Sequence, residues 1–346
     1  MASTNQVQDA GMQHPILSIM IPTYNRFDTI KATLRSAINQ QTDYNYSIAI
    51  VDNNPSNDSR TRYRRLLNEP AFSSVKYYQN SSNIGMYPNW NKCIELATTS
   101  HVTILNDDDL LSVDYVQVIS QTIRSRPQYA FYSCNVELID ESNAIFRQTV
   151  ATKLKHFSQQ LCLSLQHKDS YEVHPRDYFF ANRHCGSLGI AFSRSIFLKE
   201  RGFKQSLYPI SDYVFCTTLA THYKTLHLCR TLASYRIAYN VNTDNSSWIK
   251  SLKCDYQFRQ CILDVFKCRL PIYHAFNFLK YQYGVAIYSR LFTDDTKQSL
   301  KTMLMSVVRK STVYCPYLVV FVIARALSYF ALRKTTAPHL LQRFEY

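Results

Sequence analysis

The sequence predicts an α/β domain with a mainly parallel sheet, followed by a helical region toward the C-terminal end. Short apolar runs alternate with segments of helical periodicity and short connections through about residue 135, which is typical of an α/β fold. Beyond about residue 248 the periodicity is helical alone. Of the 346 residues, 46% are hydrophobic and 18% are charged, so the chain can bury a sizeable core and is not globally disordered.

Each expected strand in the first half is a short apolar run, and a segment with apolar residues at helical spacing follows it. The expected strands cover residues 16–21, 47–51, 75–78, 102–105 and 129–133. The helices between them are expected at residues 27–40, 59–67, 88–97 and 112–124, with Ser112 as the N-cap of the last. This order predicts one sheet with helices on its faces.

The second half is less regular. Residues 136–174 are polar and show no clear periodicity, so we expect a long loop of functional importance, such as a lid or acceptor wall. Helices are expected at 175–181 and 212–223, and extended segments at 188–192 and 225–235. A helical pattern then runs from 248 to 333, with breaks near Pro271, Asp294 and Pro316.

Missing motifs exclude several common enzyme classes. The six glycines form neither a Walker A loop, a G-x-G-x-x-G fingerprint nor a G-x-S-x-G elbow, and there is no H-E-x-x-H pair. P-loop NTPases, Rossmann dehydrogenases, standard serine hydrolases and zincins are therefore disfavoured. The ten cysteines include no C-x-x-C pair, and residues 1–14 lack an apolar run. We therefore expect reduced thiols in a cytoplasmic protein.

The formal net charge of +14 is unevenly distributed. From Lys250 onward there are 15 basic and 5 acidic residues, a net charge of +10, which leaves +4 for residues 1–249. A basic region of this kind suits an anionic partner, either lipid headgroups or nucleic acid. No nucleic-acid recognition module is recognisable, however, so we expect no nucleic-acid partner.

One apolar stretch lies in this basic region. It runs from Tyr317 to Leu332, but Arg325 interrupts it, so it is too short and too charged for a membrane span. Basic flanks beside an apolar helix face indicate attachment to an anionic leaflet, which would make the protein peripheral on the cytoplasmic face of the inner membrane. A helix that packs on the rest of the chain or on a second subunit is an equal alternative, and the oligomeric state stays open.

Polar residues gather where the expected parallel strands end, which is where ligands bind in sheets of this kind. The most informative group is Asp107, Asp108 and Asp109, three adjacent carboxylates that repel each other and that Mg²⁺ or Mn²⁺ would neutralise. A cation held in this way also binds a diphosphate. The alternative is a solvated acidic turn that caps the next helix. The other groups at strand ends are Pro22-Thr23-Tyr24-Asn25-Arg26, Asp52-Asn53-Asn54 and Asn83-Ile84-Gly85.

Together and in this order, these four segments resemble the nucleotide-sugar-binding half of family 2 glycosyltransferases of the bacterial surface-polysaccharide type, over about residues 15–245. The resemblance implies the A-type glycosyltransferase fold and an inverting reaction. It implies that Asp52 binds the uracil or ribose end of the donor, and that Asp107 to Asp109 match the D-x-D element, with Asp108 and Asp109 toward the metal and Asp107 toward the nucleotide. The residues implied to line the donor nucleotide are Pro22, Thr23, Tyr24, Asn25, Arg26, Asn83 and Gly85.

The resemblance also implies roles in the second half. Asp212, at an expected helix start, matches the catalytic base, where many relatives have two acidic residues and this chain has Ser211-Asp212. Arg236 is implied to approach the diphosphate, although an ordinary surface arginine is the alternative. Many relatives carry a histidine just after this arginine, and residues 237–239 contain none.

We therefore expect a metal-dependent enzyme that transfers a sugar from a nucleoside diphosphate sugar, with UDP favoured, to a hydroxyl of a glycan or lipid-linked oligosaccharide. The expected domains are a polar tail (1–14), a catalytic domain (15–245, divided at 135/136 into donor and acceptor halves) and a basic helical region (246–346). The alternatives are a sugar-nucleotide nucleotidyltransferase, which usually needs a glycine-rich loop that residues 12–84 lack, and a basic nucleic-acid-binding protein.

Overall fold

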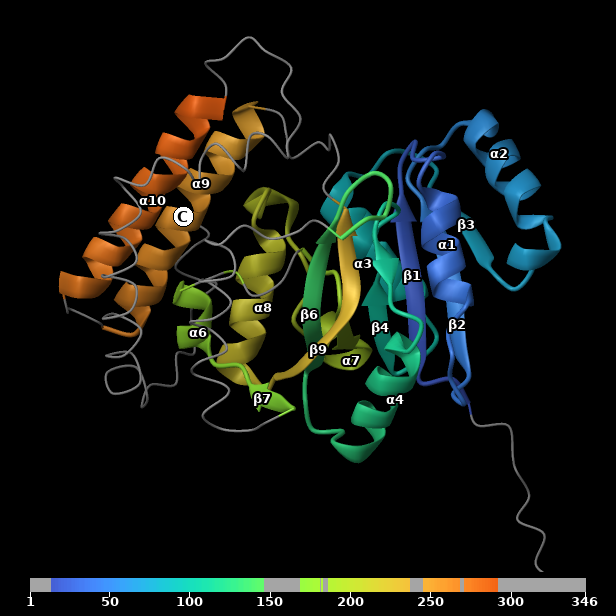
Figure 1. The fold of residues 1–346 in the computed structure, drawn as a ribbon, viewed down its shortest axis with the longest axis horizontal. Helices are drawn as coiled ribbons and strands as arrows, with labels where there is room; N and C mark the ends of the chain where they lie inside the picture. Colours follow the sequence, from blue (N-terminus) through green and yellow to red (C-terminus); the bar gives the residue numbers. More distant parts are fainter. Residues whose placement is uncertain are drawn as a thin grey trace, which may run out of the picture.

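The computed structural model describes residues 14–145, 169–180, 182, 186–236, 245–267 and 271–291 (Figure 1). Within this part a nine-stranded mixed sheet has the order β3-β2-β1-β4-β8-β6-β9-β5, and β7 pairs with β9. The strands are β1 (Leu17–Thr23), β2 (Tyr46–Asp52), β3 (Lys76–Gln79), β4 (His101–Ile104), β5 (Leu110–Leu111), β6 (Phe131–Ile139), β7 (Ser170–Glu172), β8 (Ile190–Ser193) and β9 (Leu226–Arg236).

The sheet is parallel where the sequence predicts it most clearly. β1 pairs in parallel with both β2 and β4, and β2 pairs in parallel with β3, so the carboxyl ends of these strands share one edge. β8 is antiparallel to both β4 and β6, and β6 and β9 run parallel again. The α/β prediction is therefore confirmed, and the second half of the sheet is mixed.

Helices cover both faces of the sheet. The side chains of β1 alternate: Leu17, Ile19 and Ile21 join the core under α1, α2 and α4, while Met20 joins the core on the opposite face. Residues of α3, α7 and α8 form this second core with the sheet, and residues of α6, α9 and α10 join it on the side of α8 that faces away from the sheet (Figure 1). The helices are α1 (Ile30–Ile38), α2 (Asn57–Leu67), α3 (Met86–Leu96), α4 (Tyr115–Ser125), α6 (Pro175–Phe180), α7 (Arg194–Lys199), α8 (Ser211–His222), α9 (Asn245–Val265) and α10 (Pro271–Leu291); the short 3₁₀ turns are Pro70–Phe72 and Gln205–Leu207.

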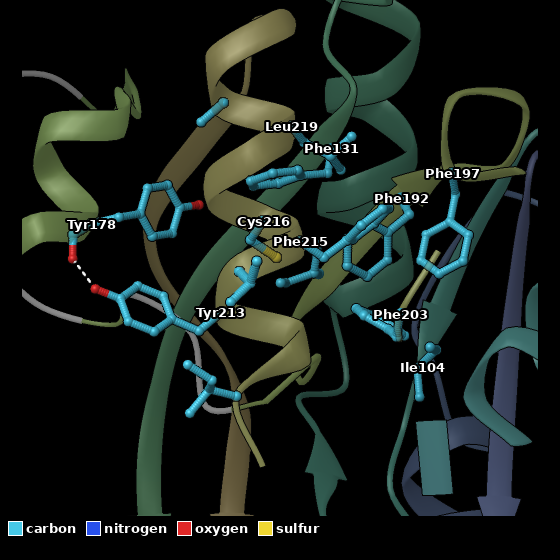
Figure 2. Packing of buried hydrophobic residues seen from close by; sticks show 14 of the residues in the cluster. Ile104, Phe131, Tyr178, Phe192, Phe197, Phe203, Tyr213, Phe215, Cys216 and Leu219 are labelled. Carbon is cyan, nitrogen blue, oxygen red and sulfur yellow. Dashed lines mark hydrogen bonds between the residues drawn. The ribbon is translucent and has the colours of Figure 1, made fainter. Parts of the chain in front are cut away.

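Helix α8 is enclosed on all sides, and every residue from Ser211 to Ala220 is buried. Figure 2 shows Phe215 on one side of α8 among the rings of Phe192, Phe197 and Phe203, and Tyr213 on the other side. The Tyr213 hydroxyl donates a hydrogen bond to the carbonyl oxygen of Tyr178 in α6. A helix buried all round has no solvent face, which explains why its sequence lacks a clear polar stripe.

The first two C-terminal helices pack on this second core. The Phe258 ring in α9 lies edge-on to Tyr213 at 4.9 Å between centroids, and Tyr273 and Phe276 of α10 contact Phe179 of α6 at 5.8 and 5.6 Å. The predicted helical pattern and the break near Pro271 are confirmed as far as residue 291. Helices α9 and α10 thus pack on the second core. The predictions for Asp294 and Pro316, and the choice between membrane attachment and packing for 317–332, concern residues outside the described ones, as do those for 1–13.

No helix in the described part of the chain is long and apolar enough to cross a membrane. The six cysteines described there, which include Cys254 and Cys261 of α9, are free thiols, as expected.

Two local predictions were wrong. Ser112 does not cap α4, which begins at Tyr115 after Asp114; instead the Ser112 hydroxyl donates to the Asp114 carboxylate at 2.6 Å. Residues 136–139 are not loop but continue β6, and Ser170–Glu172 form β7, because both segments pair with the long strand β9. The alternation of polar and apolar residues in each segment, such as Asn135 to Leu138 and Ser170 to Val173, is only a few residues long, and pairing with β9 completes each strand.

Candidate active site

The loops after β1, β2 and β4 meet at the shared edge of the sheet. The Tyr24 amide donates to the Asp107 carboxylate at 3.3 Å, and the Asn53 amide donates to the Thr23 carbonyl at 2.9 Å. Asn25, with φ of 59°, adopts the left-handed conformation that asparagine tolerates, and its side-chain oxygen accepts from Asn54. The structure therefore brings together the residues that the sequence assigned to one site.

The predicted donor residues of β1 differ in exposure. Pro22 and Thr23 are buried within the strand, and the Thr23 hydroxyl lies 2.8 Å from the Tyr63 hydroxyl. Tyr24 is 47% exposed, and Arg26 lies 4.0 Å from the Asp108 carboxylate across the mouth of the site. Tyr24 and Asn25 are exposed and Arg26 is half-buried, so these three are the members of this group that a ligand can reach from solvent.

Asp52 is fully buried, and both of its carboxylate oxygens accept hydrogen bonds. The Ser59 hydroxyl donates at 2.6 Å, the Tyr77 hydroxyl at 2.9 Å and the Asn54 amide at 2.9 Å. These bonds hold the loop after β2 against the start of α2. The predicted contact between Asp52 and a nucleotide stays a prediction, and the structure adds a positioning role in the loop.

A network of asparagine amides holds the turn before α3. The Asn53 side chain donates to Asn83 at 2.7 Å and to the Gly85 carbonyl at 3.2 Å, and it accepts from Asn80 and from the Ile84 amide, both at 3.0 Å. All four hydrogen-bonding positions of one side chain are thus used. Gly85 has φ of 90°, a conformation that glycine adopts readily. Asn53 and Asn80 were not assigned this role, although the density of asparagines was a visible signal.

The three aspartates after β4 are held differently. Asp109 is fully buried, and its oxygens accept from the Asn106 side chain at 2.8 Å and from the Arg236 amide at 2.9 Å. Asp107 and Asp108 face the β1 loop through Tyr24 and Arg26. The geometry therefore favours Asp107 and Asp108 as the pair that faces a ligand; the assignment of Asp109 to the metal stays a prediction.

The electrostatics of this cluster fit a bound cation. The pKa of Asp107 is raised to about 7, mainly by burial and also by the neighbouring Asp108 carboxylate, while hydrogen bonds and the Arg26 charge oppose the rise. Burial and the Asp108 charge also raise the pKa of Asp109. Ionising these carboxyls together is costly, and a divalent cation would offset that cost. Among the described residues no three or more His, Cys, Asp or Glu side chains converge as a metal site, so a cation here would draw further ligands from the diphosphate.

Arg236 is almost completely buried, and its guanidinium donates within the protein. Its Nε donates to the Asp108 carbonyl at 2.8 Å and its two terminal nitrogens donate to the Asp140 carbonyl at 2.8 Å and the Asn143 side chain. The surface-arginine alternative is wrong, since Arg236 ties β9 to the aspartate loop. Its predicted contact with a diphosphate stays a prediction.

Asp212 lies in the first turn of α8, as predicted, and is 7% exposed. The Tyr87 hydroxyl, from α3, lies 2.9 Å from its Oδ1 atom, and the Asn182 side chain also hydrogen-bonds it. Burial raises the pKa of Asp212, while these hydrogen bonds and the amides at the helix start oppose the rise. Tyr87 was not identified from the sequence, since nothing near it points to a residue 125 positions away.

The mixed sheet with helices on both faces is the A-type glycosyltransferase fold; here three aspartates follow β4 and one, Asp212, lies in the first turn of α8. A solved mannosyltransferase of Pyrobaculum calidifontis, in complex with GDP-Man and Mn²⁺, has the same fold with a TM-score of 0.54 and 16% identity; the alignment covers 92% of this chain and 88% of that one.

The chain belongs to glycosyl transferase family 2, whose profile matches residues 18–197. It is 24% identical to an uncharacterized glycosyltransferase of Haemophilus influenzae over 59% of its length. It is 26% identical to the GalNAc(5)-diNAcBac-PP-undecaprenol beta-1,3-glucosyltransferase of Campylobacter jejuni over 56%. The chain spans 62% and 56% of the length of these two relatives. Membership of this family removes the nucleotidyltransferase and nucleic-acid-binding alternatives.

Proposed function

We propose that the protein is an inverting, metal-assisted glycosyltransferase that uses a nucleoside diphosphate sugar. The observation that carries this proposal is the cluster of three aspartates after β4, two of which face the loop after β1. Clustered, enclosed carboxylates with raised pKa values suit a cation and the diphosphate that it would bind. Asp107 and Asp108 are the residues that would hold the cation, with Mn²⁺ or Mg²⁺ as the candidates.

The chain's own residues have separate roles in this proposal. The loop residues Tyr24, Asn25 and Arg26 line the donor nucleotide, and the asparagine network keeps the Asn83–Gly85 turn in place beside it. Asp212 accepts the proton of the acceptor hydroxyl as that oxygen bonds to the anomeric carbon and the bond from this carbon to the diphosphate breaks. A bound cation supplies positive charge for the departing diphosphate.

The donor and acceptor classes follow from the fold and the relatives. The Campylobacter relative is by name a glucosyltransferase for an undecaprenyl diphosphate glycan, and the Pyrobaculum enzyme was solved with GDP-Man. We propose a UDP-sugar as the favoured donor and a glycan hydroxyl, on a lipid-linked oligosaccharide, as the acceptor. Such an acceptor fits a role in surface-polysaccharide synthesis.

A lipid-linked acceptor places the enzyme at a membrane surface. We propose peripheral attachment to the cytoplasmic face of the inner membrane through the basic region after Lys250, which carries a net charge of +10. Deleting residues beyond 312 should then lower binding to vesicles that contain anionic lipid, and the loss should shrink at high salt. Equal binding by the full and shortened chains would reject the attachment.

A donor screen tests the function itself. The purified chain is incubated with UDP-, GDP- and dTDP-sugars, and release of the nucleoside diphosphate is measured with Mn²⁺, with Mg²⁺ and with EDTA. We expect one donor to be hydrolysed slowly to the nucleoside diphosphate, with a requirement for the cation. Turnover that is unchanged in EDTA would reject metal assistance, and the absence of both turnover and binding for all donors would reject the proposed reaction.

A further inference from the structure

The Tyr87 hydroxyl occupies the centre of a hydrogen-bond group around the start of α8. It lies 2.9 Å from Asp212 Oδ1 and 2.9 Å from the Pro209 carbonyl, and it accepts from the Ser211 amide at 3.1 Å. Tyr87 is 1% exposed, and its ring packs against Trp90 and Phe203 at 5.4 and 5.8 Å between centroids. The hydroxyl is therefore fixed in place by the ring and has no alternative position in solvent.

We propose that Tyr87 is a positioning residue for Asp212: its hydroxyl orients the carboxylate and couples the base to the turn over the donor. This inference rests on the proposed function, in which Asp212 is the general base. Tyr87 itself touches no reacting atom in this account, and it acts only through Asp212.

The coupling to the donor site follows from where Tyr87 lies in the chain. Tyr87 is the second residue of α3, and Gly85, which Asn53 holds through its carbonyl, immediately precedes that helix. Asn89, one turn further along α3, accepts from Asn80 at 2.8 Å and donates to the Val51 carbonyl. The Asn83–Gly85 turn and the start of α3 are thus attached together to the end of β2. A shift of the Asn83–Gly85 turn would therefore also shift Tyr87 and, through its hydroxyl, Asp212.

Helix α8, which carries Asp212, is also held in place by its packing. Figure 2 shows α8 held between the Phe192, Phe197 and Phe203 rings on one side and Tyr178 on the other. Because the helix backbone is fixed by this packing, the remaining freedom of Asp212 lies in its side-chain torsions. The Tyr87 hydroxyl restricts those torsions, which matters because catalytic groups need placement within a fraction of an ångström.

The same hydroxyl can serve both protonation states of Asp212. It has one proton and two acceptors at 2.9 Å, so it donates to only one of them at a time. While Asp212 is a carboxylate, donation to its charged oxygen is the stronger bond. Once Asp212 has taken the proton of the acceptor hydroxyl, the Tyr87 proton can turn to the Pro209 carbonyl, and the Tyr87 oxygen can accept from the new acid.

A change at Tyr87 should therefore move the pKa of Asp212. Among the described residues, the titratable groups that act on or are acted on by Asp212 are Tyr87 of α3 and Cys216, one turn further along α8; Asn182 is its uncharged partner. Burial raises the pKa of the Asp212 carboxyl, and the Tyr87 hydrogen bond lowers it. Removing that bond raises the pKa further, so the base becomes active only at higher pH.

The test compares Tyr87→Phe with Tyr115→Phe. Tyr115 is a fully buried tyrosine of α4 whose hydroxyl bonds the Thr103 hydroxyl at 2.8 Å, so it controls for the loss of a buried hydroxyl. With the donor found in the screen, we expect Tyr87→Phe to lower kcat roughly tenfold and to shift the acid limb of the pH profile upward by about one unit. The KM for donor and the affinity for the nucleoside diphosphate should stay within about twofold, and Tyr115→Phe should not move the pH profile.

A second variant keeps the test decisive if Tyr87→Phe is unstable. Difluorotyrosine placed at position 87 keeps the shape of the ring and makes its hydroxyl a stronger donor, so the acid limb should shift to lower pH. Shifts in opposite directions for the two substitutions support positioning of Asp212. If Asp212→Asn is inactive but neither substitution at Tyr87 moves the pH profile, the inference is overturned and the proposed function stands. If Asp212→Asn is fully active, Asp212 is not the general base. The proposed mechanism is then wrong on that point, and the inference about Tyr87 is wrong as well.

Discussion

The donor edge and the base region of this protein are built in different ways. At the donor edge, each loop follows its own parallel strand, and the loops are joined where the strands end, as in the hydrogen bonds from Asn53 to Asn83 and from Tyr24 to Asp107. In the base region, Asp212 depends on Tyr87 of α3, and its helix depends on Tyr178 of α6 and Phe258 of α9. The first kind of site is specified by strand ends, whereas the second is specified by tertiary packing.

This difference has a consequence for the C-terminal helices. Phe258 and Ile262 of α9, and Phe266 directly after it, belong to the same buried cluster as Val214 and Phe215 of α8. The predicted domain boundary at 245/246 stays a prediction, but the core continues across it. The helices after that boundary therefore support the helix that carries the proposed base.

The largest expected effect is on the base itself. Asp212→Asn should lower the rate by about 10² to 10⁴, because an amide cannot take the proton of the acceptor hydroxyl. Steady-state kinetics with the donor from the screen measure the loss. Glu172→Gln and Asp177→Asn serve as controls, since both are acidic residues of the expected acceptor half (136–245), and both should retain normal rates. A normal rate in Asp212→Asn with a large loss in either control would move the base to that residue.

The next effect concerns the packing behind the base. Phe258→Ala should lower the free energy of unfolding by about 3–5 kcal/mol, because it leaves a cavity against Tyr213 in a fully buried site. Phe278→Ala, at a ring in α10 that is 50% exposed, is the matched control and should change it by about 0.5 kcal/mol or less. Urea unfolding measures both. Equal, small losses would show that α9 does not support α8.

The smallest effect belongs to the asparagine network. Asn53→Ala removes the side-chain hydrogen bonds that Asn53 makes with Asn83, Asn80 and the Ile84 amide, so it should cost about 1–3 kcal/mol of stability. It should also weaken nucleotide binding, because the Asn83–Gly85 turn loses its anchor. Calorimetric titration with UDP measures the affinity, and Asn57→Ala, at an exposed residue that begins α2, is the control. Unchanged affinity in Asn53→Ala would separate the turn from the donor site.

Sequence patterns predicted correctly that the loops after β1, β2 and β4 share one edge of the sheet, because the carboxyl ends of parallel strands meet whatever the details of packing. They also placed Asp212 at a helix start, because the pattern that predicts a helix is local in sequence. They missed the partners that come from distant segments: Tyr87 beside Asp212, and Arg236 as the buried link between β9 and the aspartate loop. Strand β7 and the extension of β6 were missed because their polar–apolar alternation is only a few residues long, and pairing with β9 completes them as strands.

The most direct measurement is a calorimetric titration of the nucleoside diphosphate, with and without Mn²⁺, into the parent chain, Asp108→Ala and Asp212→Asn. In the proposed mechanism the aspartates after β4 hold the donor and the cation, and Asp212 accepts the proton of the acceptor hydroxyl. We therefore expect Mn²⁺ to tighten binding of the nucleoside diphosphate to the parent chain and to Asp212→Asn but not to Asp108→Ala. Retained Mn²⁺-dependent binding in Asp108→Ala, or its loss in Asp212→Asn, would contradict this division of roles.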